Sequence, residues 1–488
     1  MKQIFQCVPA RYILAIMGFC AISLQFTMKA NLSVAIVAMV KTDENANEEK
    51  FLLMESNSTA LEGTCPGGGD TEDSQSQEGE FAWDETMQGY VLSSYYYGYV
   101  AMQLPGGYLA ERYGGRYVCG PGVFLSGVLT LLSPLAARAD AYLFMAVRVL
   151  AGAASGVVIP SLQAMVSKWF HPKERSKFSG FLFSGIYAGS LIAMAVSGVL
   201  VEAGGWPMAF YFFGAVAVAW FVPWLYLIYS TPDDHPRISL QEKEYIKAGF
   251  GQQVNDKQEK LPVPWVKILT SAPVWAGIVF HSGTAWVLYT MLSDLPTYLK
   301  FILHFGVQDS GLISSLTYLF SWISGVAFGW LSQTLRAKGI LSHLTCYRLF
   351  NGITSVGAAA CLVAITLVEC QTQVIVVLLV LVLVANSGLY GGSYLNHVDL
   401  ARNFAGTIAG ILHLLMNSTG IFTPLVIGAL TKGNQTLAQW NIAFYIAAGV
   451  TCGCFVFYLI FGSVEEQSWN RPPEKSKDPE KSSPAQET

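Results

Sequence analysis

The chain has 488 residues, of which 52% are apolar and only 13% are charged. Soluble proteins carry about 25% charged residues, so this composition excludes an ordinary soluble protein and indicates a chain embedded in lipid. The net charge of −4 and the lack of a basic block exclude a nucleic-acid-binding protein. The sequence contains no C-x-x-C pair, so it suggests neither a zinc site nor a redox dithiol. Cys65 stands alone in a polar segment, and we expect an unpaired thiol there.

Long apolar segments recur along the chain, and each is long enough to cross the hydrocarbon core, which takes about 20 helical residues. The first is too long to be the apolar part of a cleaved signal peptide. We therefore predict an all-α polytopic membrane protein with about twelve transmembrane helices. The predicted spans lie near residues 11–40, 87–109, 117–137, 141–166, 178–201, 208–230, 272–293, 310–332, 343–368, 373–396, 404–430 and 439–462.

The polar segments between the spans divide the chain into five parts. We predict an N-terminal segment (1–10), a six-helix bundle (11–230) with a long loop (41–86), a central loop (231–271), a second six-helix bundle (272–462) and a disordered tail (463–488). The stretches GYLAER (107–112) and GWLSQ (329–333) each end the second span of their half and precede basic residues. Such duplicated halves are typical of secondary transporters.

The connecting segments also predict the orientation of the chain. The loop at 41–86 is acidic, whereas the short segment 168–177 and the turns at Arg112 and Arg116 are basic. By the positive-inside rule the basic turns and both termini face the cytosol. The long loop then faces the outside or a lumen. Asn57 in this loop and Asn434 in another loop on the same side are predicted glycosylation sites. The pattern fits a plasma membrane and a lysosomal or vesicular membrane equally.

Lys29 is the first candidate site residue, because an ionisable group within a span is costly and therefore functional by default. Gln25, Lys29 and Ser33 form a polar stripe on one helix face, which must line a cavity or another helix. We expect Lys29 to bind an anion; the alternative is a structural lysine paired with a carboxylate or a carbonyl.

Arg148 is the second candidate, since Gly152 and Ser155 leave space beside a guanidinium that can bind carboxylate or phosphate with two hydrogen bonds. The alternative is a snorkelling arginine near the membrane surface. Polar faces in later spans could line a cavity or bond helix to helix; they hold Asn386, Tyr390, Ser393 and His397 in the tenth span and His413 and Asn417 in the eleventh. His281 and Asp294 are further candidates, with a structural role and an interfacial position as the respective alternatives.

Two further groups complete the predicted site. From the run Tyr95, Tyr96, Tyr97 and Tyr99, one or two residues can face a cavity, and we take Tyr97 together with Asn396 as substrate-binding candidates. Glu111, Arg112 and Arg116 form a charged turn that can bridge helix ends, and we assign them, with His397, to coupling or gating.

Enzyme signatures are absent from the sequence. The triple glycine at 67–69 is not followed by the Gly-Lys-Ser/Thr of a phosphate-binding loop. No cofactor or metal site is predicted, and transport would be driven by a gradient of Na⁺ or H⁺ rather than by ATP. The expected partners are a small anionic solute, a coupling cation and the lipid bilayer.

The stretch GYLAERYGGRYV (107–118) resembles the loop motif of the major facilitator superfamily. The chain further resembles the anion transporters of solute carrier family seventeen, which include sialin, sodium–phosphate cotransporters and vesicular glutamate transporters. The similar stretches are ANLSVAIVAMV (30–40), SYYYGYVAMQLPGGYLAERYGG (94–115), HPKERSK (171–177), GWPMAFYFFG (205–214), EKEYI (242–246), PVWAGIV (273–279) and LNHVDLARNFAGTIAGI (395–411).

This resemblance implies two six-helix bundles that rock around a central anion site. It implies that Lys29 stands where the family has an arginine, that Arg148 is the family's fourth-span arginine, and that Tyr289 is a pocket tyrosine. Ala151 and Ser155 stand where the sialin-like pattern has acidic residues linked to proton coupling.

Leu92 and Thr284 replace a histidine and an arginine of the glutamate transporters. These departures favour a carrier of phosphate or of organic anions such as acidic sugars over a glutamate carrier. The alternative is a membrane receptor that keeps the transporter fold and moves no solute.

Overall fold

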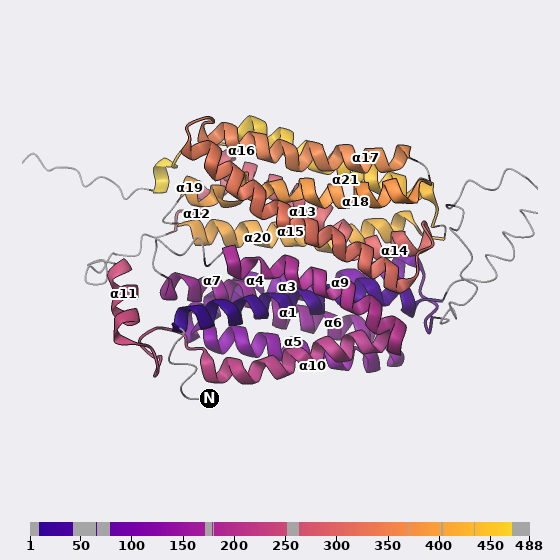
Figure 1. Cartoon of the computed structure of the whole chain (residues 1–488), viewed down its shortest axis with the longest axis horizontal. Helices are drawn as coiled ribbons and strands as arrows, with labels where there is room; N and C mark the ends of the chain where they lie inside the picture. Colours follow the sequence, from indigo (N-terminus) through magenta and orange to yellow (C-terminus); the bar gives the residue numbers. More distant parts are fainter. Residues whose placement is uncertain are drawn as a thin grey trace, which may run out of the picture.

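The computed structural model describes residues 9–41, 65, 79–170, 178, 180–250, 263–368, 370–401, 404–433 and 435–470. Helices make up nearly all of this part of the chain (Figure 1). The helices of the first half are α1 (Ala10–Met39), α3 (Glu85–Ala101), α4 (Gln103–Tyr113), α5 (Gly115–Ala139), α6 (Ala141–Gly156), α7 (Val158–Trp169), α9 (Gly185–Gly204) and α10 (Trp206–Leu227).

Two shorter helices, α11 (Leu240–Phe250) and α12 (Trp265–Leu269), lead to the second half. The second half contains α13 (Ala272–Ser293), α14 (Leu295–Phe301), α15 (Val307–Ala337), α16 (His343–Gly352), a π-helical turn (Ile353–Gly357), α17 (Ala358–Leu367), α18 (Thr372–Asn386), the 3₁₀ turns η4 (Ser387–Tyr390) and η5 (Ser393–Leu395), α19 (Asn396–Leu400), α20 (Ala405–Leu430) and α21 (Leu437–Phe461).

The prediction of a polytopic all-helical membrane protein is confirmed. Within the described residues, 10 helical segments are long and apolar enough to cross a membrane. The remaining two predicted spans, 87–109 and 272–293, are also helical and correspond to α3 with α4 and to α13. In lipid the backbone must satisfy its own hydrogen bonds, which is why every apolar segment forms a helix.

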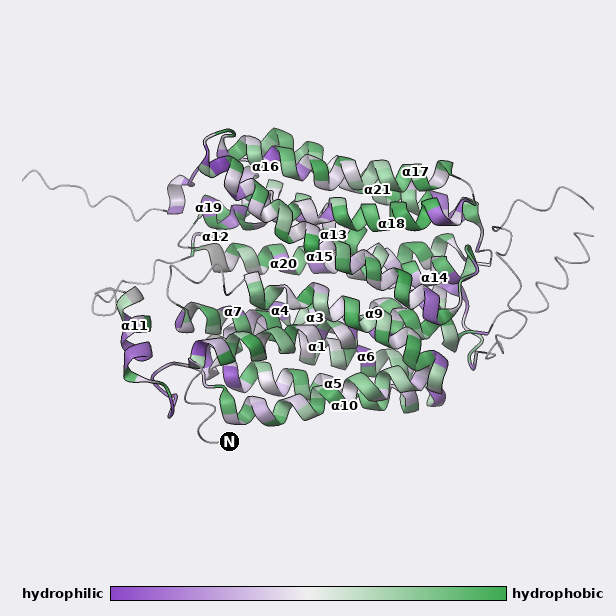
Figure 2. Ribbon diagram, viewed as in Figure 1, coloured by the Kyte–Doolittle hydropathy of each residue, from purple (hydrophilic) through white to green (hydrophobic). Residues whose placement is uncertain are grey.

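The helices run between two polar ends of the molecule. Figure 2 shows green, apolar residues along the middle of the helices and purple, polar residues near their ends. One end, the terminus end, holds the first residue of α1, helix α11 and the last residue of α21; the opposite end, the loop end, holds Asp84, Asp140 and α14. Two helices that start at the loop end are capped by aspartates: Asp84 accepts from the Met87 amide of α3 and Asp140 from the Tyr142 amide of α6, each at 2.7 Å.

The two halves form two bundles that meet along two helix pairs. Helices α1 and α3–α10 pack on one another in the first bundle, and α13–α21 do so in the second. Between the bundles, α3 packs on α20 and α9 packs on α15. These are the second and eleventh spans and the fifth and eighth spans. Each pair maps onto the other when the halves are exchanged, as expected for a duplicated chain.

The central segment 231–271 contains more structure than a loop. Its helix α11 reaches the start of α1, where the Glu242 carboxylate accepts from the amides of Ala10 at 3.0 Å and Arg11 at 3.1 Å. The first amides of a helix have no partner within the helix. Glu242 therefore supplies from the central segment the cap that the sequence before α1 lacks.

Two expectations about the chain outside the spans are wrong. The predicted disorder from residue 463 onward does not hold for 463–470, because the Gln467 amide donates to the Leu400 carbonyl at 2.8 Å and Trp469 lies against the Phe404 ring. Cys65 is not a free thiol but forms a disulfide with Cys370, 305 residues away. Because the two cysteines are so far apart in the sequence, the spacing of the cysteines could not reveal this pairing.

Candidate functional site

Lys29 lies inside an aromatic cage at the interface between the bundles. Its side chain is 5% exposed, and its Nζ lies 4.5 Å from the ring centres of Tyr96 and Tyr99, 4.6 Å from that of Tyr289 and 5.0 Å from that of Phe26. The ring faces carry negative potential and attract the ammonium group. In the described part of the chain no carboxylate pairs with Lys29.

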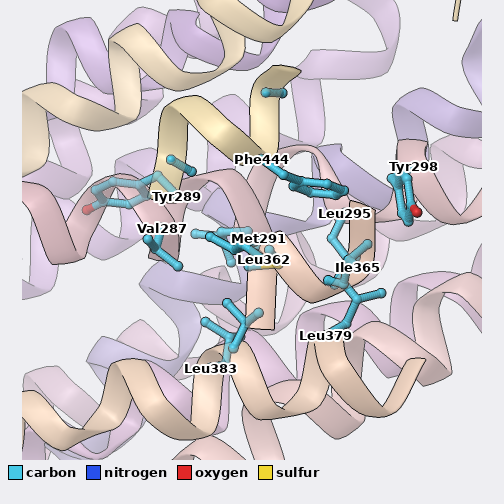
Figure 3. Close-up of a cluster of buried hydrophobic side chains, with 14 of the residues drawn as sticks. Val287, Tyr289, Met291, Leu295, Tyr298, Leu362, Ile365, Leu379, Leu383 and Phe444 are labelled. Atoms are coloured by element: carbon cyan, nitrogen blue, oxygen red, sulfur yellow. The ribbon is translucent and has the colours of Figure 1, made fainter. Parts of the chain in front are cut away.

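Tyr289 connects this cage to the second bundle. Its hydroxyl accepts a hydrogen bond from Lys29 Nζ at 3.3 Å and donates to Asn417 Oδ1 at 2.5 Å. Figure 3 shows Tyr289 at the edge of a buried apolar cluster that includes Met291 and Leu362, with its hydroxyl directed away from them. The apolar cluster thus holds the ring in place while the hydroxyl reaches the opposite bundle.

Arg148 lies beside the same turn of α1. Its Nη1 donates to the Met28 carbonyl at 3.1 Å and its Nη2 to the Lys29 carbonyl at 3.4 Å. The guanidinium stands 4.8 Å from the Tyr95 ring centre, and its Nε has no partner. Arg148 is 1% exposed, which does not fit the alternative of an arginine snorkelling to the membrane surface. Two cations from α1 and α6 therefore share one buried region, and among the described residues neither has a carboxylate partner.

The rest of the Lys29 stripe also faces the bundle interior. Gln25 Nε2 donates to the Ser155 carbonyl on α6 at 3.2 Å, and Ser33 Oγ approaches Met194 Sδ on α9 at 3.9 Å. Gln25 and Ser33 are 0% and 3% exposed. The polar stripe of α1 thus contacts helices on two sides of the first bundle.

Tyr97 does not belong to this site. Tyr90, Tyr97 and Leu104 repeat every seven residues on one face of the second span and are 48%, 42% and 49% exposed. Within the described residues no hydrogen bond or ring contact joins Tyr97 to Lys29 or Arg148. Tyr96 and Tyr99 belong to the cage instead, and Tyr95 contacts Arg148. The repeat of large residues every seven positions, at Tyr90, Tyr97 and Leu104, was the sequence signal that could have separated the two helix faces.

Glycines bring α3 close enough to α6 to build this arrangement. A Cβ atom on Gly98 would lie 1.9 Å from the Val149 carbonyl oxygen, and one on Gly152 would lie 1.9 Å from the Tyr95 carbonyl oxygen. Real Cβ atoms never come so close. Only glycine at these positions lets Tyr95 and Tyr99 reach the two cations.

The other predicted site residues lie elsewhere. Asn396 is buried in the second bundle, where its Nδ2 donates to the Tyr458 hydroxyl at 3.3 Å, and no contact joins it to Lys29. His397 is next to it on α19. Arg112 donates to the Tyr108 hydroxyl at 3.0 Å on its own helix. Arg116 donates to the Leu225 carbonyl and so ties α5 to the end of α10 within the first bundle.

Three predicted residues lie outside the described part of the chain. Asn57 and Asn434 are not among the described residues, and neither is the side chain of Glu111. Their predicted roles in glycosylation and gating stay predictions.

The bundles also meet at the loop end. Lys300 Nζ of α14 donates to the Val37 carbonyl of α1, and the Gly433 amide donates to Glu85 Oε2 of α3 at 3.0 Å. The Cys65–Cys370 disulfide joins the two halves at the same end. Glycines again permit the close approach, since a Cβ on Gly428 would lie 2.5 Å from the Glu85 carbonyl oxygen. Several contacts therefore join the two bundles on the loop side of Lys29.

Comparison with known proteins places this geometry in a family. Residues 15–424 match the family described as Major Facilitator Superfamily. The chain is 37% identical to human sialin, covering 95% of this chain and 91% of that protein. It is 34% identical to a putative inorganic phosphate cotransporter of Drosophila melanogaster (98% and 89% covered) and 33% identical to human vesicular glutamate transporter 2 (96% and 77% covered).

Solved structures agree on the fold. A bacterial homologue of the human lysosomal transporter Spinster, in an inward-facing and occupied conformation, superposes with a TM-score of 0.65 at 13% identity, covering 93% of this chain and 97% of that one. The D-xylose–proton symporter gives a TM-score of 0.63 at 14% identity, with 93% and 98% covered. The chain is a transporter that belongs to the major facilitator superfamily and, within it, to solute carrier family seventeen.

Proposed function

We propose that this transporter carries small anions, either inorganic phosphate or organic anions such as acidic sugars, by alternating access coupled to a Na⁺ or H⁺ gradient. The observation that carries the proposal is the pair of buried cations, Lys29 and Arg148, without a carboxylate partner in the described part of the chain. A buried charge without a counter-ion is costly. An anionic solute entering from the terminus side would supply the missing charge.

The alternating movement is supported by how the bundles meet. Lys29 and Tyr289 join the two bundles at the site itself, and the Lys300–Val37 and Gly433–Glu85 hydrogen bonds join them at the loop end. An anion that draws the Lys29 ammonium away from Tyr289 breaks the central contact between bundles. Binding would therefore bias the equilibrium between the two arrangements, as coupled transport requires.

We further propose that both termini are cytosolic and that the loop end faces the outside or a lumen. The basic turns of the terminus end support this orientation. The Cys65–Cys370 disulfide supports it independently, because disulfides persist in oxidising compartments and not in the cytosol.

The test is transport by the purified protein in proteoliposomes. Labelled phosphate, sialic acid, urate and glutamate are offered in turn, first in counterflow and then with an imposed Na⁺ gradient, proton gradient or membrane voltage. We expect counterflow of at least one anion and its accumulation under one gradient. If none of the four anions exchanges in folded protein, the proposal fails and a receptor that retains the fold becomes the better interpretation.

A further inference from the structure

Three histidines from three helices of the second bundle gather on the terminus side of Tyr289. They are His281 on α13, His397 on α19 and His413 on α20. These three helices pack on one another, and Ile278, Leu400 and Leu412, each within one turn of one of the histidines, belong to one buried apolar cluster. Nothing in the anion site described above uses them.

The histidine cluster has unused hydrogen-bonding capacity. His281 is 1% exposed, and neither of its ring nitrogens makes a well-formed hydrogen bond, although the Gly277 backbone one turn earlier interacts with the ring; His397 Nδ1 has no partner. Buried polar atoms without partners are rare and call for an occupant such as water, an ion or a proton. Among the described residues no group of histidine, cysteine, aspartate and glutamate has the arrangement of a metal site.

The groups around the cluster leave its charge uncompensated. Tyr394 faces His281, with the ring centres 6.3 Å apart, and Tyr458 of α21 bonds to Asn396 beside His397. Asp399 on α19, two residues after His397, already has partners on α16: its carboxylate accepts from the Tyr347 hydroxyl at 2.8 Å and lies 3.5 Å from His343 Nε2. Leu104 of α4 contributes only an apolar side chain, against Gly410 of α20.

His413 lies one helical turn before Asn417, the residue of α20 that bonds to the cage. Asn417 Nδ2 donates to the His413 backbone carbonyl at 2.7 Å, and Asn417 Oδ1 accepts from the Tyr289 hydroxyl, which in turn accepts from Lys29. The His413 imidazole takes no part in these bonds, so one turn of α20 is what joins the histidine cluster to the Tyr289 hydroxyl.

We propose that His281, His397 and His413 form the proton-binding site of this transporter, so that one proton moves with each anion. An imidazole takes up a proton in one compartment and returns it in the other, and no other bond changes. Because a charge on one ring opposes a charge on its neighbours, the cluster holds a single proton. The added positive charge attracts the anion and offsets its negative charge during the crossing. This inference rests on the proposed function and adds its coupling ion and site.

The experiment compares accumulation with exchange in proteoliposomes. Labelled phosphate and labelled sialic acid are tested in counterflow, which needs no net proton movement, and under an imposed pH gradient. We expect the ratio of gradient-driven accumulation to counterflow to fall at least tenfold in His281→Gln and in His413→Gln. The control His304→Asn changes an exposed histidine with a positive φ of 56°, which asparagine tolerates, and should keep the wild-type ratio.

The outcomes separate the two proposals. Proton influx of one per anion, followed with a trapped pH dye, supports the histidine site if His413→Gln abolishes it. Wild-type counterflow without any effect of the pH gradient overturns the histidine proposal and leaves anion transport standing, as does an unchanged ratio in both variants. Folded variants that lose counterflow as completely as accumulation also overturn it. Absence of wild-type counterflow overturns the proposed function itself.

Discussion

The ammonium of Lys29 is held by four aromatic faces and one hydroxyl rather than by a carboxylate. Each ring stabilises a nearby cation by about 0.5–2 kcal/mol, which keeps the charge in place without neutralising it. A carboxylate partner would compete with an incoming anion. Aromatic rings do not, and this difference suits a site that must remain available between transport cycles.

Loss of either cation should abolish transport. We expect Lys29→Ala and Arg148→Ala to reduce uptake at least tenfold, which corresponds to about 1.4 kcal/mol of lost interaction, while surface expression stays near that of the wild type. Lys267→Ala, at an exposed lysine, is the matched control. Uptake is measured per molecule at the surface; variants that lose expression but transport normally per molecule would contradict the assignment.

The Tyr289 hydroxyl has a separable role. Tyr289→Phe keeps the ring over Lys29 and removes both the bond to Lys29 and the bond to Asn417. A hydrogen bond to a charged group is worth about 1.5–3 kcal/mol, and about 1.4 kcal/mol is a factor of ten, so we expect the half-saturating anion concentration to change by about tenfold or more. Tyr97→Phe, at an exposed tyrosine outside the cage, should match the wild type; equal effects of the two substitutions would remove Tyr289 from the site.

At the scale of helices, the site depends on the close approach of α3 and α6. Gly152→Ala places a Cβ against the Tyr95 carbonyl oxygen, so the helices must separate. Gly449→Ala in α21 is the matched control, because nothing lies within 4 Å of its added Cβ and alanine favours a helix by about 1 kcal/mol. We expect Gly152→Ala to lower the thermal unfolding temperature of the detergent-solubilised protein and Gly449→Ala to leave or raise it. Equal unfolding temperatures would show that the interface can relax.

The helices themselves could be predicted from the sequence, whereas their contacts could not. In lipid, an apolar segment of span length must form a helix to satisfy its backbone hydrogen bonds. Lys29 and Arg148 could be identified as site candidates because a charged residue within such a segment is costly. The choice among Tyr95, Tyr96, Tyr97 and Tyr99 failed because four aromatic residues in five positions surround a helix, and the neighbours decide which of them are buried.

On the scale of the whole molecule, the contacts between halves follow the duplication of the chain. The second span meets the eleventh and the fifth meets the eighth, so each half contributes the same two spans to the interface. Helix α1 and Tyr289 of α13 join the halves at the centre. The Lys300–Val37 and Gly433–Glu85 hydrogen bonds lie toward one end of this interface, and each joins one bundle to the other.

The disulfide between Cys65 and Cys370 turns the middle of the polypeptide into a closed ring that includes the central segment. A single cut in that segment opens the ring but leaves both fragments on one covalent chain. With a specific protease site inserted between Phe250 and Val263, the cleaved protein should migrate as one species in denaturing gels without reductant and as two with it. The cleaved Cys65→Ser variant should give two species with and without reductant. If the cleaved protein that keeps both cysteines separates into two species without reductant, the Cys65–Cys370 pairing is contradicted. Cleavage of the peptide bond between the two halves therefore does not let them separate, because the disulfide still joins them.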